Sequence, residues 1–431
     1  MNFLKKQSPV RIISLGFALV ILIGSVLLSL PCSIRDGVTL RYIDALYMST
    51  SAVCVTGLLT VDAGDTFTPL GQFFLGMLIQ VGGLGVTAVG TGVILAMGKK
   101  INLKARNLIR EAGNLDSGKG VIRFIRLVFL TTVTFELAGA ALSFLVFRKS
   151  FPPLKAAGVS LFHSVASFNN SGFDILGGGQ NLIPYQDDML LNLVTCALVI
   201  FGGIGFLVIR EVIAKRFRWK KLSMHAKVVL FMSLVLTAAG TVLLKLTEDI
   251  TWMGAFFTSV SARTAGFSTF PLGSFSSAGL LTVIVLMVIG ASPGSTGGGI
   301  KTTTCYVLFE GIRSSATNTS EKAFRYAVPA DAFRKAAVIT LLAIGIVLSG
   351  TYILVILEPG VPFLDALFEM SSAFGTAGLS TGISAGLCDA AKILTILIMF
   401  IGRLGPLTIA SLWYFTKGER VSYPEGNIAI G

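Results

Sequence analysis

The stretch LFEMSSAFGTAGLST, residues 367–381, is moderately apolar, rich in small side chains and too short to cross a membrane. It follows a long apolar run and carries a glycine, Gly378, near its end. Three other segments have the same character: LYMSTSAVCVTGLLT at 46–60, LFHSVASFNNSGFDI at 161–175 and FFTSVSARTAGFST at 256–269. Such internal repetition predicts a protein built from four related units.

The four segments align on one glycine each: Gly57, Gly172, Gly266 and Gly378. An aromatic residue stands ten positions before each of these glycines: Tyr47, Phe162, Phe256 and Phe368. A large apolar residue follows each one: Leu58, Phe173, Phe267 and Leu379. The next apolar run of each unit carries further glycines: Gly82, Gly83, Gly202, Gly203, Gly290 and Gly402. The sequence therefore predicts a unit of span, half-helix, glycine turn and span.

The composition is that of a membrane-embedded protein. Of the 431 residues, 53% are hydrophobic and 13% are charged, and the mean hydropathy is +0.80. Soluble domains carry about 25% charged residues. Eight apolar runs are each long enough to cross a hydrocarbon core of about 30 Å. They cover roughly residues 10–30, 70–97, 122–147, 188–209, 226–246, 278–312, 334–357 and 391–415.

Positive charges predict the orientation, because Lys and Arg collect on the cytoplasmic side of membrane proteins. Most of the 35 Lys and Arg lie before the first run, after the eighth, or between runs two and three, four and five, and six and seven. Both termini are therefore expected in the cytoplasm. The net charge of +13 reflects such loops, including the basic stretch from Lys99 to Arg126, and nucleic-acid binding explains it less well.

Other signals are weak. The first run is longer than the 7–15-residue core of a signal peptide, so cleavage is disfavoured. The five cysteines form no CxxC pair, so neither a disulfide nor a zinc site is expected. His163 and His225 stand alone, and no proton relay is inferred.

The glycine turns suggest their own chemistry. A re-entrant half-helix leaves unpaired carbonyls at membrane depth, which is tolerated only where they line a watery cavity. Glycine accepts a positive φ, so the carbonyls around it can turn inward. Four such turns would form rings of carbonyl oxygen able to replace the hydration shell of a monovalent cation. The plainer alternative, four glycines that merely end four interfacial helices, does not explain four matched copies.

The turns VTGL, NNSGF, RTAGF and GTAGLST, with GASPGSTGGGIKTTT at 290–304 and IGRLGPLT at 401–408, resemble the TrkH/KtrB/HKT superfamily of potassium transporters over essentially the whole chain. The number of spans and the ending YPEGNIAIG are most similar to the KtrB branch, the membrane subunits of bacterial Ktr systems. Ser171 departs from the pattern, since alanine is common there.

The expected fold is an all-α polytopic membrane protein. Four span–pore-loop–span repeats, with eight transmembrane helices, would surround one pore in a pseudo-fourfold arrangement. The repeats would cover residues 1–97, 98–220, 221–320 and 321–431, the last with a C-terminal tail. The resemblance implies a homodimer in the bacterial plasma membrane, with a cytoplasmic nucleotide-binding ring of KtrA-type subunits. It implies potassium uptake, often sodium-stimulated, and no cofactor other than potassium or sodium.

The potassium filter is expected at the residues up to and including each glycine, through backbone carbonyls rather than side chains. These residues are Val55, Thr56, Gly57, Asn170, Ser171, Gly172, Thr264, Ala265, Gly266, Thr376, Ala377 and Gly378. In plant relatives a serine at the first of these glycines accompanies sodium preference. The resemblance therefore implies that Gly57 favours potassium.

The stretch GASPGSTGGGIKTTT interrupts the sixth run with five glycines and a proline between residues 290 and 299. A phosphate-binding loop is disfavoured, because Ile300 separates Gly299 from Lys301 and the loop would lie inside the membrane. In the family this position is an intramembrane loop that obstructs the pore. The expected gate comprises Gly290, Ser292, Pro293, Gly294, Gly297, Gly298, Gly299, Lys301 and Arg403.

Each remaining intramembrane charge has its own interpretation. A charged side chain inside the membrane costs free energy and usually faces a cavity or a partner. Arg403 is expected below the filter, where its charge would raise the barrier to cations; a structural ion pair is the alternative. Arg263 is expected to brace the pore helices, with Glu369 as a candidate partner, and Glu136 to pair within the bundle. Five acids on the outer side are candidates to attract cations, although most such acids are merely solvated: Asp62, Asp65, Asp174, Asp187 and Asp188.

The sequence is compatible with three functions. A gated potassium pore subunit is the principal hypothesis. A coupled carrier with alternating access is the alternative; it is disfavoured because the four repeats run in one direction rather than as inverted pairs. A membrane enzyme that uses the glycine-rich loop is disfavoured because no cluster of His, Asp or Glu lies on the cytoplasmic side.

Overall fold

The computed structural model describes residues 9–86, 88–90, 121–329 and 331–411. Helices dominate this part of the chain, and the single two-stranded sheet in it is antiparallel, pairing Lys322 with Ala327. The expected boundary between the first two repeats, the ends of the second and eighth apolar runs, and the C-terminal tail lie outside the described residues.

The elements recur in the same order four times. A long helix comes first in each unit: α2 (Pro9–Leu28), α8 (Val121–Phe147), α12 (Met224–Thr247) and α16 (Ala332–Leu357). A short helix follows: α3 (Tyr42–Cys54), α9 (Pro153–Phe168), α13 (Trp252–Ala262) and α17 (Phe363–Gly375). A third helix completes the unit: α5 (Pro69–Leu84), α10 (Met189–Ile204), α14 (Ser277–Val288) and α18 (Asp389–Leu404).

Shorter elements connect these helices or continue them. Three helices follow the third helix of their units: α11 (Phe206–Ala214), α15 (Thr302–Thr317) and α19 (Pro406–Ser411). The strands β1 (Lys322–Ala323) and β2 (Tyr326–Ala327) lie between α15 and α16. The remaining elements are α4 (Ala63–Thr66) and five single 3₁₀ turns at 31–33, 183–185, 219–221, 272–274 and 384–386.

The third helices begin where the sequence supplies an N-cap. The side chains of Thr68, Asp188 and Ser276 accept hydrogen bonds from the backbone N–H three residues later, at donor–acceptor distances of 3.2, 2.9 and 3.1 Å. Each such bond satisfies one of the N–H groups that a helix start leaves free. A polar residue therefore fixes where α5, α10 and α14 start, whereas α18 begins after Cys388 without a side-chain cap.

Three of the third helices end at a residue whose backbone conformation is favourable only for glycine. Gly85, Gly205 and Gly405 have φ values of 85°, 97° and 91° with ψ near 134–140°. A Cβ atom would be strained in this backbone region. Beyond Gly205 the chain turns by 97° into α11. The fourth such helix, α14, ends at Val288 and runs into the glycine-rich stretch instead.

The eight expected spans are therefore of two kinds. Four are confirmed as single long apolar helices, in α2, α8, α12 and α16, and the bent pair of α10 and α11 has the composition of a fifth. The other even-numbered runs are interrupted within or just beyond the apolar stretch. Their glycines were visible in the sequence, but the sharp bends they permit were not predicted for runs two, four and eight.

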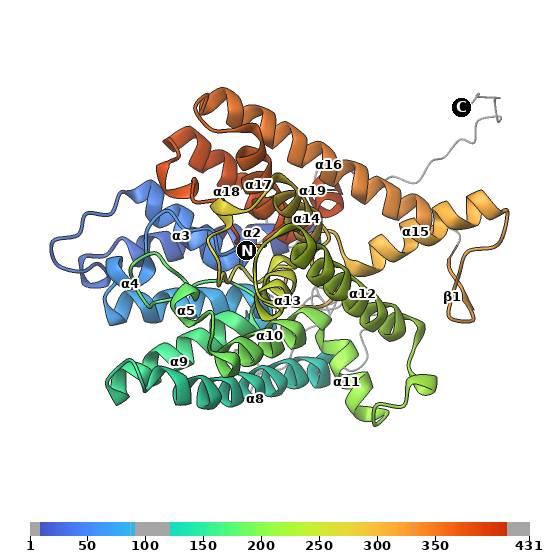
Figure 1. Ribbon diagram of the computed structural model, residues 1–431, viewed down its shortest axis with the longest axis horizontal. Coiled ribbons are helices and arrows are strands. Elements are labelled where there is room, and N and C mark those ends of the chain that lie inside the picture. The colour runs from blue at the N-terminus through green and yellow to red at the C-terminus, as the bar shows by residue number, and fades with distance from the viewer. Residues whose placement is uncertain (1–8, 87, 91–120, 330, 412–431) are drawn as a thin grey trace, which may run out of the picture.

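The contacts between units run in a cycle. The third helix of each unit packs on the short helix of the next: α5 on α9, α10 on α13, and α14 on α17. The last of them, α18, packs on α3 of the first unit. Figure 1 shows the chain passing round the molecule in this order, from blue α3 through green α9 and α10 to red α17 and α18, which lie beside α3 again.

A glycine in each long helix lets the short helix approach closely. A Cβ at Gly24, Gly139 or Gly240 would collide with a serine hydroxyl on the short helix of the same unit. These hydroxyls, of Ser49, Ser164 and Ser259, donate to backbone carbonyls of the long helix at 2.6–2.8 Å. In the fourth unit Gly350 instead faces Met370 and Ile398. Small residues at a helix interface are the usual means of close packing in membranes.

Candidate functional site

The backbone takes the same turn after each short helix. Val55, Asn170, Thr264 and Thr376 all have positive φ, at 56°, 58°, 112° and 50°. Two residues later the aligned glycines also have positive φ, at 98°, 69°, 77° and 79°. A positive φ is uncommon for Asn and a genuine outlier for the β-branched Val and Thr. Strain of this kind persists only where the surroundings hold it in place, and it clusters at functional sites.

The turns direct their N–H groups backwards, toward the short helices. The N–H groups of Thr56, Ser171 and Ala377 donate to carbonyls five residues earlier, and that of Ala265 to Ser261, at 2.8–2.9 Å. These four residues are completely buried. Within the described chain no hydrogen bond reaches the carbonyl oxygens of the eight turn residues that precede the glycines, 55–56, 170–171, 264–265 and 376–377. Buried carbonyls without donors are rare in proteins and call for a ligand or water.

The four glycines form a closed ring. A Cβ atom at Gly57 would lie 2.5 Å from the carbonyl oxygen of Ser171, one at Gly172 would lie 2.7 Å from that of Ala265, and one at Gly266 would lie 3.0 Å from that of Ala377. A Cβ at Gly378 would collide with the carbonyl oxygen of Thr56, which closes the circle. Each glycine thus faces a carbonyl of the next unit, the one that belongs to the residue just before that unit's glycine. No side chain larger than hydrogen fits on this ring without displacing a carbonyl.

A vestibule of about 490 Å³ lies on the outer side of the ring. Gly57, Gly266 and Gly378 line it, together with two acids, Asp62 and Asp174. No Lys, Arg or His lines it among the described residues. The pKa of Asp174 is raised to about 7, chiefly by burial; the Leu176 N–H lowers it, and the nearby carboxylates of Asp62 and Asp65 raise it. The lining of the vestibule therefore carries net negative charge.

Three of the five expected acids form hydrogen bonds that organise the outer loops and the start of α10. Asp62 and Asp65 accept hydrogen bonds from the N–H groups of Gly179 and Gly178, at 2.7 and 2.8 Å, and so tie the first unit to the second. Asp188 caps α10. Asp187 is exposed and does not line the vestibule. Of the five acids, the structure brings two, Asp62 and Asp174, to the wall of the vestibule.

The glycine-rich stretch lies directly against the inner side of the ring. The N–H of Gly298 donates to the Thr376 hydroxyl at 3.0 Å, and a Cβ at Gly297 would collide with the Thr264 hydroxyl. On its other side the loop pairs with the bend between α10 and α11: the N–H groups of Ser292 and Thr296 donate to Gly203 and Gly202 at 3.0 and 3.2 Å, and that of Phe206 donates to Gly294 at 3.1 Å. Three units therefore hold the loop in place beneath the ring.

The loop closes on itself at its neck. The N–H of Ala291 donates to the carbonyl of Gly298 at 3.2 Å, and a Cβ at Gly290 would meet the same carbonyl. Gly294, which follows Pro293, and Gly299 have positive φ, at 70° and 69°. Ser292 is fully buried, and its hydroxyl lies 2.9 Å from that of Thr302.

Two cations hold the loop's carbonyls. The Nζ of Lys301 donates to the carbonyls of Gly297 and Gly298 at 2.8 and 3.3 Å. The guanidinium of Arg403 donates to the carbonyl of Thr296 and, from its other nitrogen, to those of Gly82 and Gly83 near the end of α5. Lys301 is thus engaged by its own loop rather than presented to a phosphate. Arg403 joins the loop to the first unit.

The geometry can be compared with known proteins. The family model described as "TrkH: Cation transport protein" matches residues 10–416. The chain belongs to this family. It is 36% identical to the Ktr system potassium uptake protein B of Bacillus subtilis, covering 98% of this chain and 97% of that protein. It is 35% identical to the potassium/sodium uptake protein NtpJ of Enterococcus hirae, over 99% and 98% of the two chains.

The fold agrees with a solved member of the family. The crystal structure of the potassium transporter TrkH from Vibrio parahaemolyticus matches 95% of this chain with a TM-score of 0.75 at 19% identity, and 86% of that chain is covered. Together with the long apolar helices, family membership identifies a membrane protein of the cation transport class.

Of the two expectations about the partners of intramembrane charges, one is wrong and the other is confirmed. Arg263 does not pair with Glu369: its guanidinium donates to the carbonyl and hydroxyl of Ser233 and to the hydroxyl of Thr237, all on α12. Glu369 instead accepts from Ser380 and Ser384. Arg263 is thus held by α12, and Glu369 by the loop that follows α17. Glu136 does bond within the bundle, but to the amide of Asn169 at 3.0 Å rather than to a cation.

Sequence reasoning missed the side chains that connect ring and loop. The hydroxyls of Thr264 and Thr376 face the loop, and the Thr296 hydroxyl donates to the carbonyl of Phe168 at 3.3 Å. Asn170 lies next to Thr264, with its amide 2.9 Å from the hydroxyl. The sequence identified Asn170, Thr264 and Thr376 for their backbone carbonyls only, and their shared position two residues before the aligned glycines is the signal that could have pointed to their side chains as well. Thr296 had no such signal.

Proposed function

We propose that this protein is the membrane pore subunit of a Ktr-type system for potassium uptake. The observation that carries the proposal is the ring of four glycines bordered by buried carbonyl oxygens that no protein donor reaches. Carbonyl rings of this kind replace the hydration shell of potassium in selective pores. The names of the relatives support the choice of ion, since they describe potassium uptake and potassium/sodium uptake.

The pore follows from the arrangement of the units. We infer that four span–pore-loop–span repeats, with eight transmembrane helices, surround one pore in pseudo-fourfold arrangement. The cycle of contacts from α5 through α10, α14 and α18 back to α3 supports this inference. The potassium filter comprises the three residues that end at each aligned glycine, and this chain binds no cofactor other than potassium or sodium.

The glycine-rich loop is the proposed gate, with Lys301 and Arg403 as the residues that hold it. The loop lies between the ring and the cytoplasmic half of the protein, so an ion leaving the ring inward must displace it. A shift between two loop positions would then control conduction. The name of the Ktr relatives supports a regulatory partner, and we propose a cytoplasmic KtrA-type nucleotide-binding ring. We further propose a homodimer in the bacterial plasma membrane with both termini in the cytoplasm, and stimulation by sodium.

Potassium uptake in uptake-deficient cells tests the proposal. Cells that express this chain with a KtrA-type partner should take up potassium, and cells that express it alone should take up less. Competition with sodium then measures selectivity. If proteoliposome flux shows a fixed ratio of sodium or protons to potassium, the protein is a coupled carrier rather than a pore. If correctly inserted protein takes up no alkali cation, transport is refuted.

A further inference from the structure

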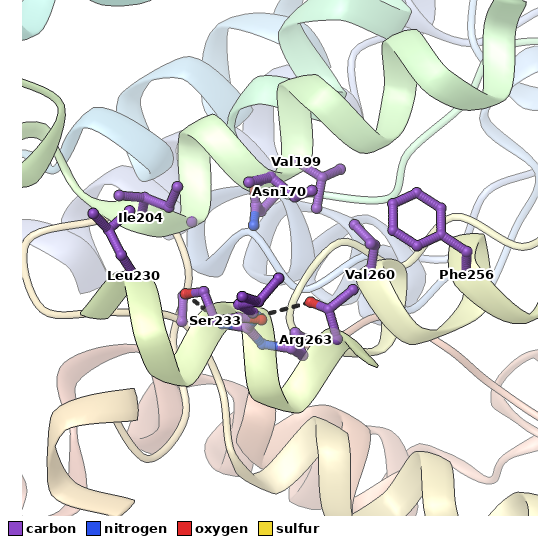
Figure 2. A pocket seen from close by; sticks show the side chains of 13 residues that line it. Asn170, Val199, Ile204, Leu230, Ser233, Phe256, Val260 and Arg263 are labelled. Carbon is purple, nitrogen blue, oxygen red and sulfur yellow. Dashed lines mark hydrogen bonds between the residues drawn. The ribbon is translucent and has the colours of Figure 1, made fainter. Parts of the chain in front are cut away.

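A second cavity lies beside the pore rather than on it. It measures about 250 Å³ and is bounded by α10 of the second unit and by α12 and α13 of the third (Figure 2). Most of its wall is apolar, formed by Val199, Ile204, Leu230, Leu234, Phe256 and Val260. Its inner wall includes Asn170 of the second turn and Ala291 of the glycine-rich loop. The cavity therefore adjoins both the ring and the loop.

One charged residue lines this cavity, and it has no anionic partner. The Arg263 guanidinium donates only to neutral acceptors on α12, and its Nε is buried with no hydrogen-bond partner. Among the described residues Arg263 forms no ion pair. It follows the last residue of α13, where the helix dipole offsets part of its charge. A cation at this depth pairs with an anion or with backbone carbonyls, and Arg263 has one such carbonyl, that of Ser233, while its Nε remains without an acceptor.

The cavity opens toward the surrounding lipid. Leu234 at its rim is 70% exposed, and the same face of α12 carries further exposed apolar side chains. Ser233 and Thr237, which hold Arg263, lie near the middle of the 24-residue α12. The guanidinium is therefore close to mid-depth of the membrane. An occupant must combine one anionic group, set deep in the cavity, with an apolar portion that leaves past Leu234.

We propose that this cavity binds a long-chain fatty acid, with its carboxylate on the Arg263 guanidinium and its chain directed past Leu234 into the bilayer. The planar guanidinium matches a carboxylate, and its unpartnered Nε supplies a free donor. A phospholipid is a poorer occupant because a cavity of about 250 Å³ has no room for its phosphate, its glycerol and a second acyl chain. The site is independent of the proposed transport function, since binding requires no ion to cross.

Thermal unfolding of the purified, detergent-solubilised protein tests the site, because a ligand that binds the folded state raises Tm. The probes are palmitate and 1-hexadecanol, which share a chain and differ in charge. Palmitate should raise Tm in a concentration-dependent way, and hexadecanol should not. Arg263→Gln should weaken palmitate binding on the order of a hundredfold, as expected for a buried charge pair that loses one partner. Native mass spectrometry should count one palmitate per chain.

Two tryptophan variants test the site independently of Arg263→Gln, in case that variant fails to fold. Leu234→Trp fills the rim of the cavity and should abolish the palmitate shift. Leu246→Trp on the same helix is the matched control, because Leu246 is 76% exposed and does not line the cavity, and it should bind palmitate like the parent protein. Equal shifts with palmitate and hexadecanol, or equal binding by the two tryptophan variants, would overturn the proposal.

Discussion

Val55 has a left-handed backbone (φ 56°, ψ 48°), which a β-branched side chain adopts only under constraint. The constraint comes from the end of the short helix, where the N–H of Thr56 bonds to the carbonyl of Ser51 and the N–H of Gly57 bonds to the Ser51 hydroxyl. Thr376 occupies the equivalent place with nearly the same angles. The cost of each strained residue, about 1–3 kcal/mol, is offset by the surrounding packing. Its effect is to leave the following carbonyls free of N–H partners.

Arg403 provides a test at the level of one side chain. It bonds to the loop and to α5, and its charge lies on the inner side of the ring. Arg403→Ala should raise potassium flux about tenfold, equivalent to roughly 1.4 kcal/mol off the internal barrier, without loss of selectivity. Arg403→Lys keeps the charge but cannot bridge both carbonyl groups, and flux should rise less. Proteoliposome flux measures both. A fall in flux in correctly assembled Arg403→Ala would mean that the arginine only holds the bundle together.

Asp174 makes the outer vestibule sensitive to pH. Its pKa of about 7, raised by burial, means that the carboxylate is charged above pH 7 and becomes neutral as the pH falls through that value. The potassium concentration for half-maximal uptake should therefore rise about two- to threefold between pH 8 and pH 6, since less negative charge attracts the cation. Asp174→Asn should remove this dependence. Asp187→Asn, an exposed acid outside the vestibule, should retain it, and an unchanged pH profile in Asp174→Asn would contradict the assignment.

At the scale of elements, the third unit differs from the others. In the other units a glycine of the third helix packs on the last carbonyls of the short helix: Gly82 on Val53, Gly202 on Phe168 and Gly402 on Phe374. In the third unit Gly290 packs on Gly298 of the glycine-rich loop. The inserted loop therefore occupies the space that a helix bend fills elsewhere. One departure from the repeat places a glycine-rich loop under an otherwise regular ring.

Deletion of residues 294–297 tests the gate. The deletion removes Thr296, which Arg403 and the α10–α11 bend both contact, but leaves Ala291 and Gly298 at the neck. Potassium flux should become high and independent of the cytoplasmic partner. Lys301→Ala should have a milder effect, because backbone bonds and Arg403 still hold the loop. Loss of flux in both variants, with normal expression and dimerisation, would exclude a gate and revive a ligand-binding role for the loop.

The sequence predicted the repeated unit and the turns better than the path of the third helices. Alignment on Gly57, Gly172, Gly266 and Gly378 identified the residues that the structure brings into one ring, because a positive φ and a close carbonyl both require glycine. The bends at Gly85, Gly205 and Gly405 were missed because hydropathy continues unchanged past them. The proposed pairing of Arg263 with Glu369 failed because composition cannot say which helix a side chain faces.

At the scale of the whole molecule, the first and last units are joined by a buried ion pair. The Nζ of Lys392 on α18 lies 2.6 Å from the Asp44 carboxylate on α3, and the two side chains are 3% and 9% exposed. This contact lies where α18 packs on the first unit and completes the cycle. A buried pair adds little net stability over apolar residues, but loss of one partner leaves a buried charge.

Lys392→Met should therefore destabilise the folded protein by about 2 kcal/mol, less than the usual loss for a broken buried pair, because the Asp44 carboxylate keeps the more exposed Arg41 guanidinium at 3.1 Å as its remaining partner. The double variant Lys392→Met with Asp44→Asn should recover most of that loss. Asp389→Asn, which removes only the exposed pair with Arg41, serves as the control and should change little. Unfolding midpoints in detergent measure all three. A double variant no more stable than the single one would show that the pair does not account for the effect.

The central claim is that four equivalent glycines, one per unit, close a single potassium-selective ring. The most direct measurement is potassium uptake under sodium competition for alanine at each position in turn, Gly57, Gly172, Gly266 and Gly378, with Gly382→Ala as the control. Gly382 has an equally unfavourable φ of 105° but open space around its Cβ position, so it imposes the backbone strain without the collision. All four ring variants should lose discrimination between potassium and sodium, and the control should keep it. If any ring position behaves like Gly382, the four turns do not form one ring around the ion.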